Sequence, residues 1–363
     1  AIDADGRPVG MVSASSLMRL RSTEALVIGD EVAGAENADA LAHAFARLPL
    51  LARSLRAEGV EALVVTGAIS ALIREMTARA AELAVRDMAD AGWGAAPAPW
   101  CVLVLGSGGR GESALAADQD NALVHEGSPA DDAWFAEAGR RIAETLAAAG
   151  LPKCKGGVMA MNPEWRRSLA SWREEISRWI GKKEGEALLN VDIFFDFAPV
   201  FGDRTLAERL RAEALEATSH APMFLRMLAA ELATKGTALG LFGMFRTEQG
   251  RIDIKRGGFL PIVAAARILA LKHRIPACGT VERIEALSAQ GALGPADAES
   301  LIRAYKMLLG FLVEQQTLDI AAGIAPSPRI EPGRLPAIRR RALREALRAG
   351  AAVGEIVQGP LSG

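Results

Sequence analysis

The sequence predicts an α/β protein in which a small sheet lies between an N-terminal and a C-terminal helical region. Three observations support this fold class. Residues 100–106 form a continuous apolar run, WCVLVLG, that ends in glycine, as expected of a buried strand. The stretches 118–125 and 188–200 also have the length and composition of strands. The sequence on either side of this central part repeats apolar residues at helical spacing.

Composition excludes several classes of protein. The 363 residues are enough for two or three domains, and 50% hydrophobic with 24% charged residues is typical of globular proteins. A net charge of -2 and a pI near 6.2 lack the basic excess of a general nucleic-acid binder. No apolar run reaches the roughly 20 residues of a membrane span. We therefore expect neither nucleic acid nor a membrane as a partner.

The three cysteines indicate a reducing environment. Cys101, Cys154 and Cys278 are far apart and form no CxxC pair. Such spacing supports neither a zinc site nor a disulfide framework. We expect a cytoplasmic protein.

Residues 1–24 resemble the end of a CBS domain. A turn at Asp5-Gly6, a short strand at Val9–Val12 and a helix start at Ser13 match the pattern D-x-x-G-x-x-V-G-I-V-S-x-x-D-L. The alternative is an unrelated turn that leads into the next helix. The resemblance implies a CBS remnant, a chain cut from a longer protein, and a homodimer formed through the CBS regions.

The next region, residues 25–92, is predicted to be helical. Apolar residues recur at steps of three and four from Leu41 to Leu55. Pro49 should kink or break this helix, and Gly59 should end it. A second helix is expected from Ile69 to Ala91.

The central region, residues 93–204, contains the three expected strands. A helix is predicted between the second and third strands at residues 131–149, and another at 165–180, with tryptophans on one face. From residue 205 to 325 the pattern is nearly all helical, interrupted at 235–258. The tail, residues 326–363, begins Pro-rich and ends basic.

The candidate site lies around the first two strands. Gly106-Ser107 ends the first strand, and Asp118 and Asp120 begin the second. Positions i and i+2 of a strand point to the same side, so the two carboxylates should project together. Such a pair repels unless a cation lies between, and oxygen ligands favour Mg²⁺ or Mn²⁺. A glycine turn admits a phosphate to the backbone, and Arg110 would add a cation. The alternative is a pair of solvated turn residues.

The string G-S-G-G-R-G-E…D-Q-D-N-A-L identifies a resemblance. G-S-x10-D-x-D resembles the polymerase-β-type nucleotidyltransferase signature. The fuller string resembles the putative nucleotidyltransferase family known as domain of unknown function 294, with its C-terminal substrate-binding-like domain, and is similar to the uridylyltransferase that modifies PII signalling proteins. This resemblance covers residues 40–325. It implies a small mixed sheet of the polymerase-β type and transfer from an NTP (ATP or UTP) to an acceptor, expected to be a signalling protein.

A third carboxylate is expected on the strand predicted at 188–200. Asp192 and Asp196 are four residues apart, so strand alternation places both on one face and cannot choose between them. The family pattern F-F-D-F/L-x-P-V-x-G-D matches Asp196. The resemblance therefore implies that Asp196 is the third metal ligand.

A second wall of the site is predicted from RIDIKRGGFLPIV at 251–263. Gly257-Gly258 would open a long helix with free amides, a site for anions that Lys255 and Arg256 would reinforce. The segment resembles D-x-K-x-x-x-G-G-L-R-D of the PII uridylyltransferase and of glutamine-synthetase adenylyltransferase. The alternative is a basic loop that caps the helix. Residues 155–157, Lys-Gly-Gly, are expected near the same cleft.

These features combine into one mechanistic hypothesis. Asp118, Asp120 and Asp196 would hold two Mg²⁺ (or Mn²⁺) ions, and the glycine turn with its basic partners would position the triphosphate. The residues assigned to nucleotide binding are Gly106, Ser107, Arg110 and Lys255. Two alternatives remain: a regulatory module of a CBS-containing signalling protein that senses NTP without transfer, and a protein-interaction scaffold.

Overall fold

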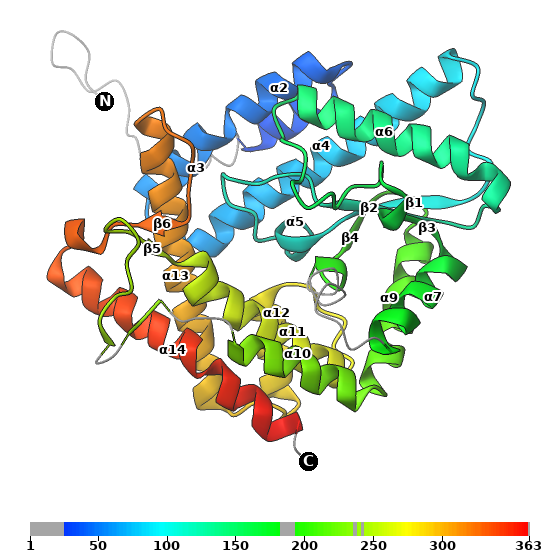
Figure 1. Ribbon diagram of the computed structural model, residues 1–363. Helices are drawn as coiled ribbons and strands as arrows, with labels where there is room; N and C mark the ends of the chain where they lie inside the picture. Colours follow the sequence, from blue (N-terminus) through cyan, green and yellow to red (C-terminus); the bar gives the residue numbers. More distant parts are fainter. Residues whose placement is uncertain (1–24, 182–192, 235–237, 241–242, 362–363) are drawn as a thin grey trace, which may run out of the picture.

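The computed structural model describes residues 25–181, 193–234, 238–240 and 243–361 (Figure 1). The fold is mixed α/β, with a four-stranded sheet flanked by helices, as the sequence predicts. The strands are β1 (Trp100–Val104), β2 (Asn121–His125), β3 (Arg166–Ser168) and β4 (Ala198–Gly202), in the order β3-β2-β1-β4. β1 runs antiparallel to β2 and β4, whereas β2 and β3 are parallel. The CBS-like segment, residues 1–24, lies outside the described residues.

The strand register brings distant segments to one edge of the sheet. Val104, at the end of β1, pairs with Asn121 on one side and with Ala198 on the other. β1 and β2 are buried along their whole length, consistent with their apolar sequences. The glycine turn after β1, the residues before β2 and the residues before β4 therefore meet at this edge.

Helices cover both faces of the sheet. α4 (Ala62–Asp90) and α6 (Asp132–Ala148) pack on one face, and α7 (Leu169–Gly181) and α9 (Arg204–Ser219) lie on the other (Figure 1). α2 (Ala38–Ala46) and α3 (Leu48–Ala57) precede α4 and are separated at Arg47, so the break predicted at Pro49 is confirmed.

Several predicted elements differ from the structure. The helix expected from Ile69 begins seven residues earlier, at Ala62. The helix expected from Trp165 begins at Leu169, because Arg166–Ser168 instead pairs with β2 as a short edge strand. The third strand covers only Ala198–Gly202, with residues 193–194 helical and a turn at 195–196. The strand-alternation argument therefore does not apply to Asp196, and Asp192 lies outside the described residues.

The C-terminal part is helical up to the end of the described chain. Its main helices are α10 (Pro222–Thr234), α11 (Leu260–Lys272), α12 (Thr280–Ala289), α13 (Pro295–Ala321) and α14 (Ala337–Leu361). The basic tail forms α14, which packs on α10, α11 and α13 through buried side chains that include Leu343 and Leu347. β5 (Ile252–Asp253) pairs with β6 (Arg329–Ile330), so the tail is part of this helical region.

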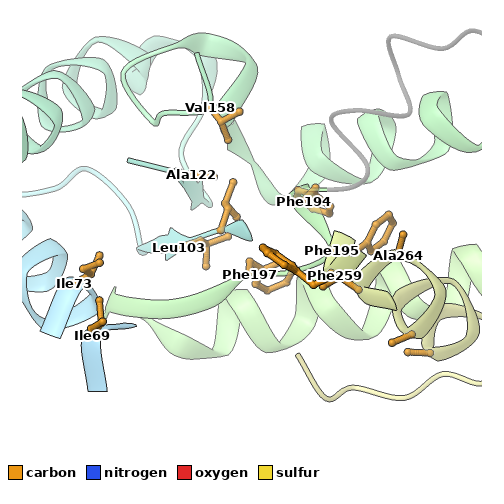
Figure 2. Close-up of a cluster of buried hydrophobic side chains, with 14 of the residues drawn as sticks. Ile69, Ile73, Leu103, Ala122, Val158, Phe194, Phe195, Phe197, Phe259 and Ala264 are labelled. Carbon is orange, nitrogen blue, oxygen red and sulfur yellow. The ribbon is translucent and has the colours of Figure 1, made fainter. Parts of the chain in front are cut away.

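One hydrophobic core connects the sheet to the C-terminal helices. Phe194, Phe195 and Phe197 lie between Leu103 of β1 and Phe259, the residue before α11 (Figure 2). This packing explains why the segment before β4 is a turn: its aromatic side chains fill the space between two regions rather than one face of a sheet. Among the described residues, no helix has the combined length and apolar character that crossing a membrane requires.

Candidate active site

Two carboxylates and a thiol form the acidic site, which we define as Asp118, Asp120 and Cys154. Their ligand atoms lie within 4.8 Å of one another. Gln119 forms a parallel bridge with Lys153, which brings Cys154 beside the two aspartates. The Gln119 side chain points the other way and donates to the carbonyls of Ala143 and Leu151 at 3.0 and 2.9 Å. Asp118 and Asp120 therefore project to the same side of the chain, as the sequence predicts, and Gln119 projects to the other.

The electrostatics of this pair favour a cation. Burial, followed by the charge of Asp118, raises the pKa of Asp120 to about 6. A hydrogen bond from Cys154 and the charges of Lys255 and Arg110 act in the opposite direction. Burial and the nearby Asp120 raise the pKa of the Cys154 thiol to about 11. The thiol therefore remains protonated at neutral pH and donates a hydrogen bond to Asp120.

The predicted turn after β1 is a short helix, α5 (Gly106–Arg110), which ends at Gly111. We keep the name glycine turn for residues 106–111, which lie directly against the acidic site. Gly106 has a φ of +56°, and a Cβ there would lie 2.9 Å from Oδ2 of Asp120. Ser107 and Asp118 line the same small hollow. The Ser107 hydroxyl is 3.3 Å from that of Ser113. Only glycine allows the backbone to pass this close to the carboxylate.

Lys255 approaches the acidic site from the C-terminal helices. It is exposed, yet its charge lowers the pKa of Asp120. The ammonium group therefore lies within electrostatic range of the carboxylates. The structure brings together four of the residues that the sequence assigns to the site, Gly106, Ser107, Asp118 and Asp120, and the charge of Lys255 acts on them from the C-terminal helices.

The backbone around Lys255 differs from the prediction of free amides. The Asp253 carboxylate accepts hydrogen bonds from the amides of Lys255 and Arg256, both at 2.9 Å. A Cβ on Gly257 would lie 2.6 Å from the backbone nitrogen of Ala238. Gly257 thus allows close packing, as does Gly258, which is also buried. What this loop offers to a ligand is the Lys255 side chain.

Asp196 lies at the centre of three arginines. Its Oδ1 accepts from Nε of Arg267 at 3.0 Å and from Nη1 of Arg283 at 2.6 Å. Its Oδ2 accepts from Nη1 of Arg110 at 2.6 Å and Nη2 of Arg267 at 2.5 Å. Burial by itself raises the pKa of Asp196, but the three positive charges outweigh it and hold the pKa well below its usual range. The structure therefore does not bring Asp196 into the acidic site as a metal ligand.

Arg110 takes part in the same buried ion pairs. Its Nε lies 2.6 Å from Oε2 of Glu112, and its side chain is 6% exposed. Glu112 in turn accepts from the amide of Thr280 at 2.6 Å and from its hydroxyl at 3.0 Å. The phosphate contact predicted for Arg110 does not match this arrangement, because Glu112 and Asp196 occupy its guanidinium.

These five residues form what we call the interface ion network: Arg110, Glu112, Asp196, Arg267 and Arg283. It joins the glycine turn and the segment before β4 to α11 and α12. The sequence holds one signal for it, since Arg267 is the single charge in an otherwise apolar part of α11 and a buried cation needs an anion.

Comparison with known proteins agrees with this geometry. Residues 46–186 match the family model described as putative nucleotidyltransferase DUF294, and residues 222–359 match the model for the putative nucleotidyltransferase substrate binding domain. No curated protein matches the chain. The first match contains the glycine turn and the acidic site, and the second contains Lys255 and most of α14. Together the two matches cover most of the chain, which belongs to the DUF294 family of nucleotidyltransferases.

Proposed function

We propose that this enzyme transfers a nucleotidyl group from ATP or UTP to an acceptor at the acidic site. One observation supports the proposal above all others. Asp118 and Asp120 project together beside the Gly106-Ser107 turn, and Lys255 approaches them from the second domain. A paired carboxylate, a turn without side-chain bulk and a cation are the groups that a metal-bound triphosphate needs.

The donor set fits a divalent metal. Two carboxylates supply oxygen ligands, which suit Mg²⁺ or Mn²⁺. Burial, followed by the charge of Asp118, raises the pKa of Asp120, and a bound cation would offset both effects. A metal held by Asp118 and Asp120 would neutralise triphosphate charge and lower the pKa of the acceptor's hydroxyl group.

The protein's own groups would position the substrate. Because Gly106 lacks a side chain, a phosphate can approach the backbone next to Asp120, where the Ser107 hydroxyl is a donor. Lys255 would contact the triphosphate from the opposite domain with a charge-assisted bond. The nucleotide would then lie between the two regions, and both would be needed to bind it.

The interface ion network would hold these two regions in register. Asp196 anchors Arg110 of the glycine turn to Arg267 and Arg283 of the C-terminal helices. For Asp196 to become a third metal ligand, its arginine contacts would have to break. The proposal therefore assigns the metal to Asp118 and Asp120 and gives Asp196 a positioning role.

Label transfer tests the reaction. ATP and UTP labelled at the α-phosphate are incubated with the protein, Mg²⁺ or Mn²⁺, and a native lysate that supplies acceptors. We expect the label to appear on a macromolecule of the lysate, and we expect this acceptor to be a signalling protein. The variant Asp118→Asn should transfer no label. A parallel reaction uses NTP labelled at the γ-phosphate. Transfer of that label, without transfer of the α-label, would contradict nucleotidyl transfer. Metal-dependent NTP binding without transfer would favour the nucleotide-sensing alternative, in which CBS regions of a longer, dimeric protein provide the output.

A further inference from the structure

A cavity of about 500 Å³ lies on the other side of the glycine turn from the acidic site. Its walls come from residues 109–112 of the turn region, from residues 197–199 before and in β4, and from α4, α9 and α12. Asp118, Asp120 and Cys154 do not line it; Asp118 and Asp120 line a separate hollow with Ser107. The volume is within the range of small-molecule sites, roughly 300–1,000 Å³.

Two arginines reach this cavity without a carboxylate partner among the described residues. Arg74 donates from Nε and Nη2 to the carbonyls of Gly108 and Gly109, at 2.8 and 2.7 Å. Arg211 donates to the carbonyl of Phe197 and lies over its ring, 4.1 Å from the centroid. Both guanidiniums keep further N–H donors beyond these contacts.

The remaining charges on the wall leave the cavity cationic. Arg110 and Glu112 are paired with each other in the interface ion network. Glu282 is exposed, and its carboxylate lies close to Gly279: a Cβ added to Gly279 would be 3.1 Å from Oε2 of Glu282. Burial lowers the pKa of Arg74, while the nearby Cys278 and Glu282 act against it. Apart from the paired Arg110 and Glu112, the lining therefore carries two positive charges, on Arg74 and Arg211, and one negative charge, on Glu282.

The rest of the lining is apolar. It includes Leu63, Phe197, Pro199, Pro276 and Val281. A ligand that fits this wall needs an anionic group for the guanidiniums and a short carbon body for the apolar side chains.

We propose that the cavity binds a small organic dianion, a phosphate monoester or a dicarboxylate with a short apolar body. Arg74 and Arg211 would bind the oxyanion, and Phe197 with the prolines would contact the carbon body. Residues 109–111 of the glycine turn line the cavity, and Arg74 also holds the carbonyls of Gly108 and Gly109, so the ligand would lie directly against the glycine turn. The site would be separate from the nucleotide site.

Binding of two probes, phenyl phosphate and succinate, tests the proposal by calorimetry. We expect at least one probe to bind the wild-type protein, and Arg211→Gln to weaken that binding at least tenfold. The matched control is Arg209→Gln on the same helix, because Arg209 pairs with Glu126 at the surface. Asp118→Asn should also leave the affinity unchanged. The two probes distinguish a phosphate ligand from a carboxylate ligand. No binding at millimolar concentration, or equal binding by Arg211→Gln, would overturn the proposal.

Thiol labelling of the wild-type protein gives a second readout that needs no substitution. Cys278 lines the cavity, Cys154 belongs to the acidic site, and Cys101 is buried as an internal reference. The bound probe should slow the labelling of Cys278 by N-ethylmaleimide and leave the labelling rate of Cys154 unchanged, as read by mass spectrometry. Mg²⁺ with NTP should protect Cys154 instead of Cys278. If the proposed nucleotide site is wrong, this protection of Cys154 fails, while protection of Cys278 by the probe is unaffected. Protection of Cys154 by the probe, without protection of Cys278, would place the probe at the wrong site and overturn the inference.

Discussion

Replacing Asp196 with asparagine separates the positioning role from a role as metal ligand. The substitution removes the carboxylate that Arg110, Arg267 and Arg283 share, so three buried cations each lose a negatively charged partner. Removing one partner of a buried ion pair typically costs about 3–5 kcal/mol. We expect Asp196→Asn to lower the free energy of unfolding by about this amount, measured by urea titration with circular dichroism and tryptophan fluorescence.

The matched control is Asp118→Asn. Asp118 is exposed and repels Asp120, so its loss should change the free energy of unfolding by no more than roughly 0.5 kcal/mol. It should nevertheless abolish metal-dependent nucleotide binding. Counted over the five residues of the interface ion network, the double variant Asp196→Asn/Arg267→Met returns to an excess of one cation, and it should recover part of the lost stability. If Asp196→Asn unfolds like the wild type but loses turnover, Asp196 is a metal ligand and the positioning role is wrong.

Three further predictions concern separate parts of the molecule. Lys255→Ala should weaken triphosphate binding by about 1–3 kcal/mol and should hardly change the binding of a nucleoside without phosphates. The neighbouring control, Arg256→Ala, should hardly change triphosphate binding. Equal losses of affinity for both ligands in Lys255→Ala, measured by calorimetry, would contradict a phosphate contact. Gly109→Ala should destabilise the fold, since its Cβ would lie 1.8 Å from a backbone carbonyl oxygen, whereas Gly354→Ala meets nothing within 4 Å; similar melting temperatures would refute this. Burial lowers the pKa of His125 to about 4, below the roughly 6.5 of an unfolded chain. The contribution of neutral His125 to stability is therefore present above pH 6.5 and is lost as the pH falls toward 4. If the denaturation midpoint of His125→Phe depends on pH as steeply as that of the wild type, this account of His125 is wrong.

Local sequence was sufficient to predict the first half of the site. The apolar run before Gly106 specifies a buried strand, and the i, i+2 spacing of Asp118 and Asp120 specifies a shared side. Both features depend on residues near each other in the chain. The helix breaks at Pro49 and Gly59 were predictable for the same reason.

The second half depends on contacts between distant segments. Asp196 meets Arg267 and Arg283, which are 71 and 87 residues away, and no periodicity reports such a pairing. The stretch 188–200 has strand composition, but its phenylalanines pack between the sheet and α11, so tertiary packing overrides strand propensity. β3 was missed because a three-residue edge strand that reads Arg-Arg-Ser has no apolar signal.

Calorimetric titration of NTP, with and without Mg²⁺ or Mn²⁺, tests the central claim most directly. If Asp118 and Asp120 hold a metal that binds the triphosphate, the wild-type protein should bind ATP or UTP only with the metal present. Asp120→Asn should then lose at least tenfold in affinity, or about 1.4 kcal/mol. Equal affinity with and without metal, or in Asp120→Asn and the wild type, would contradict the assignment of the acidic site.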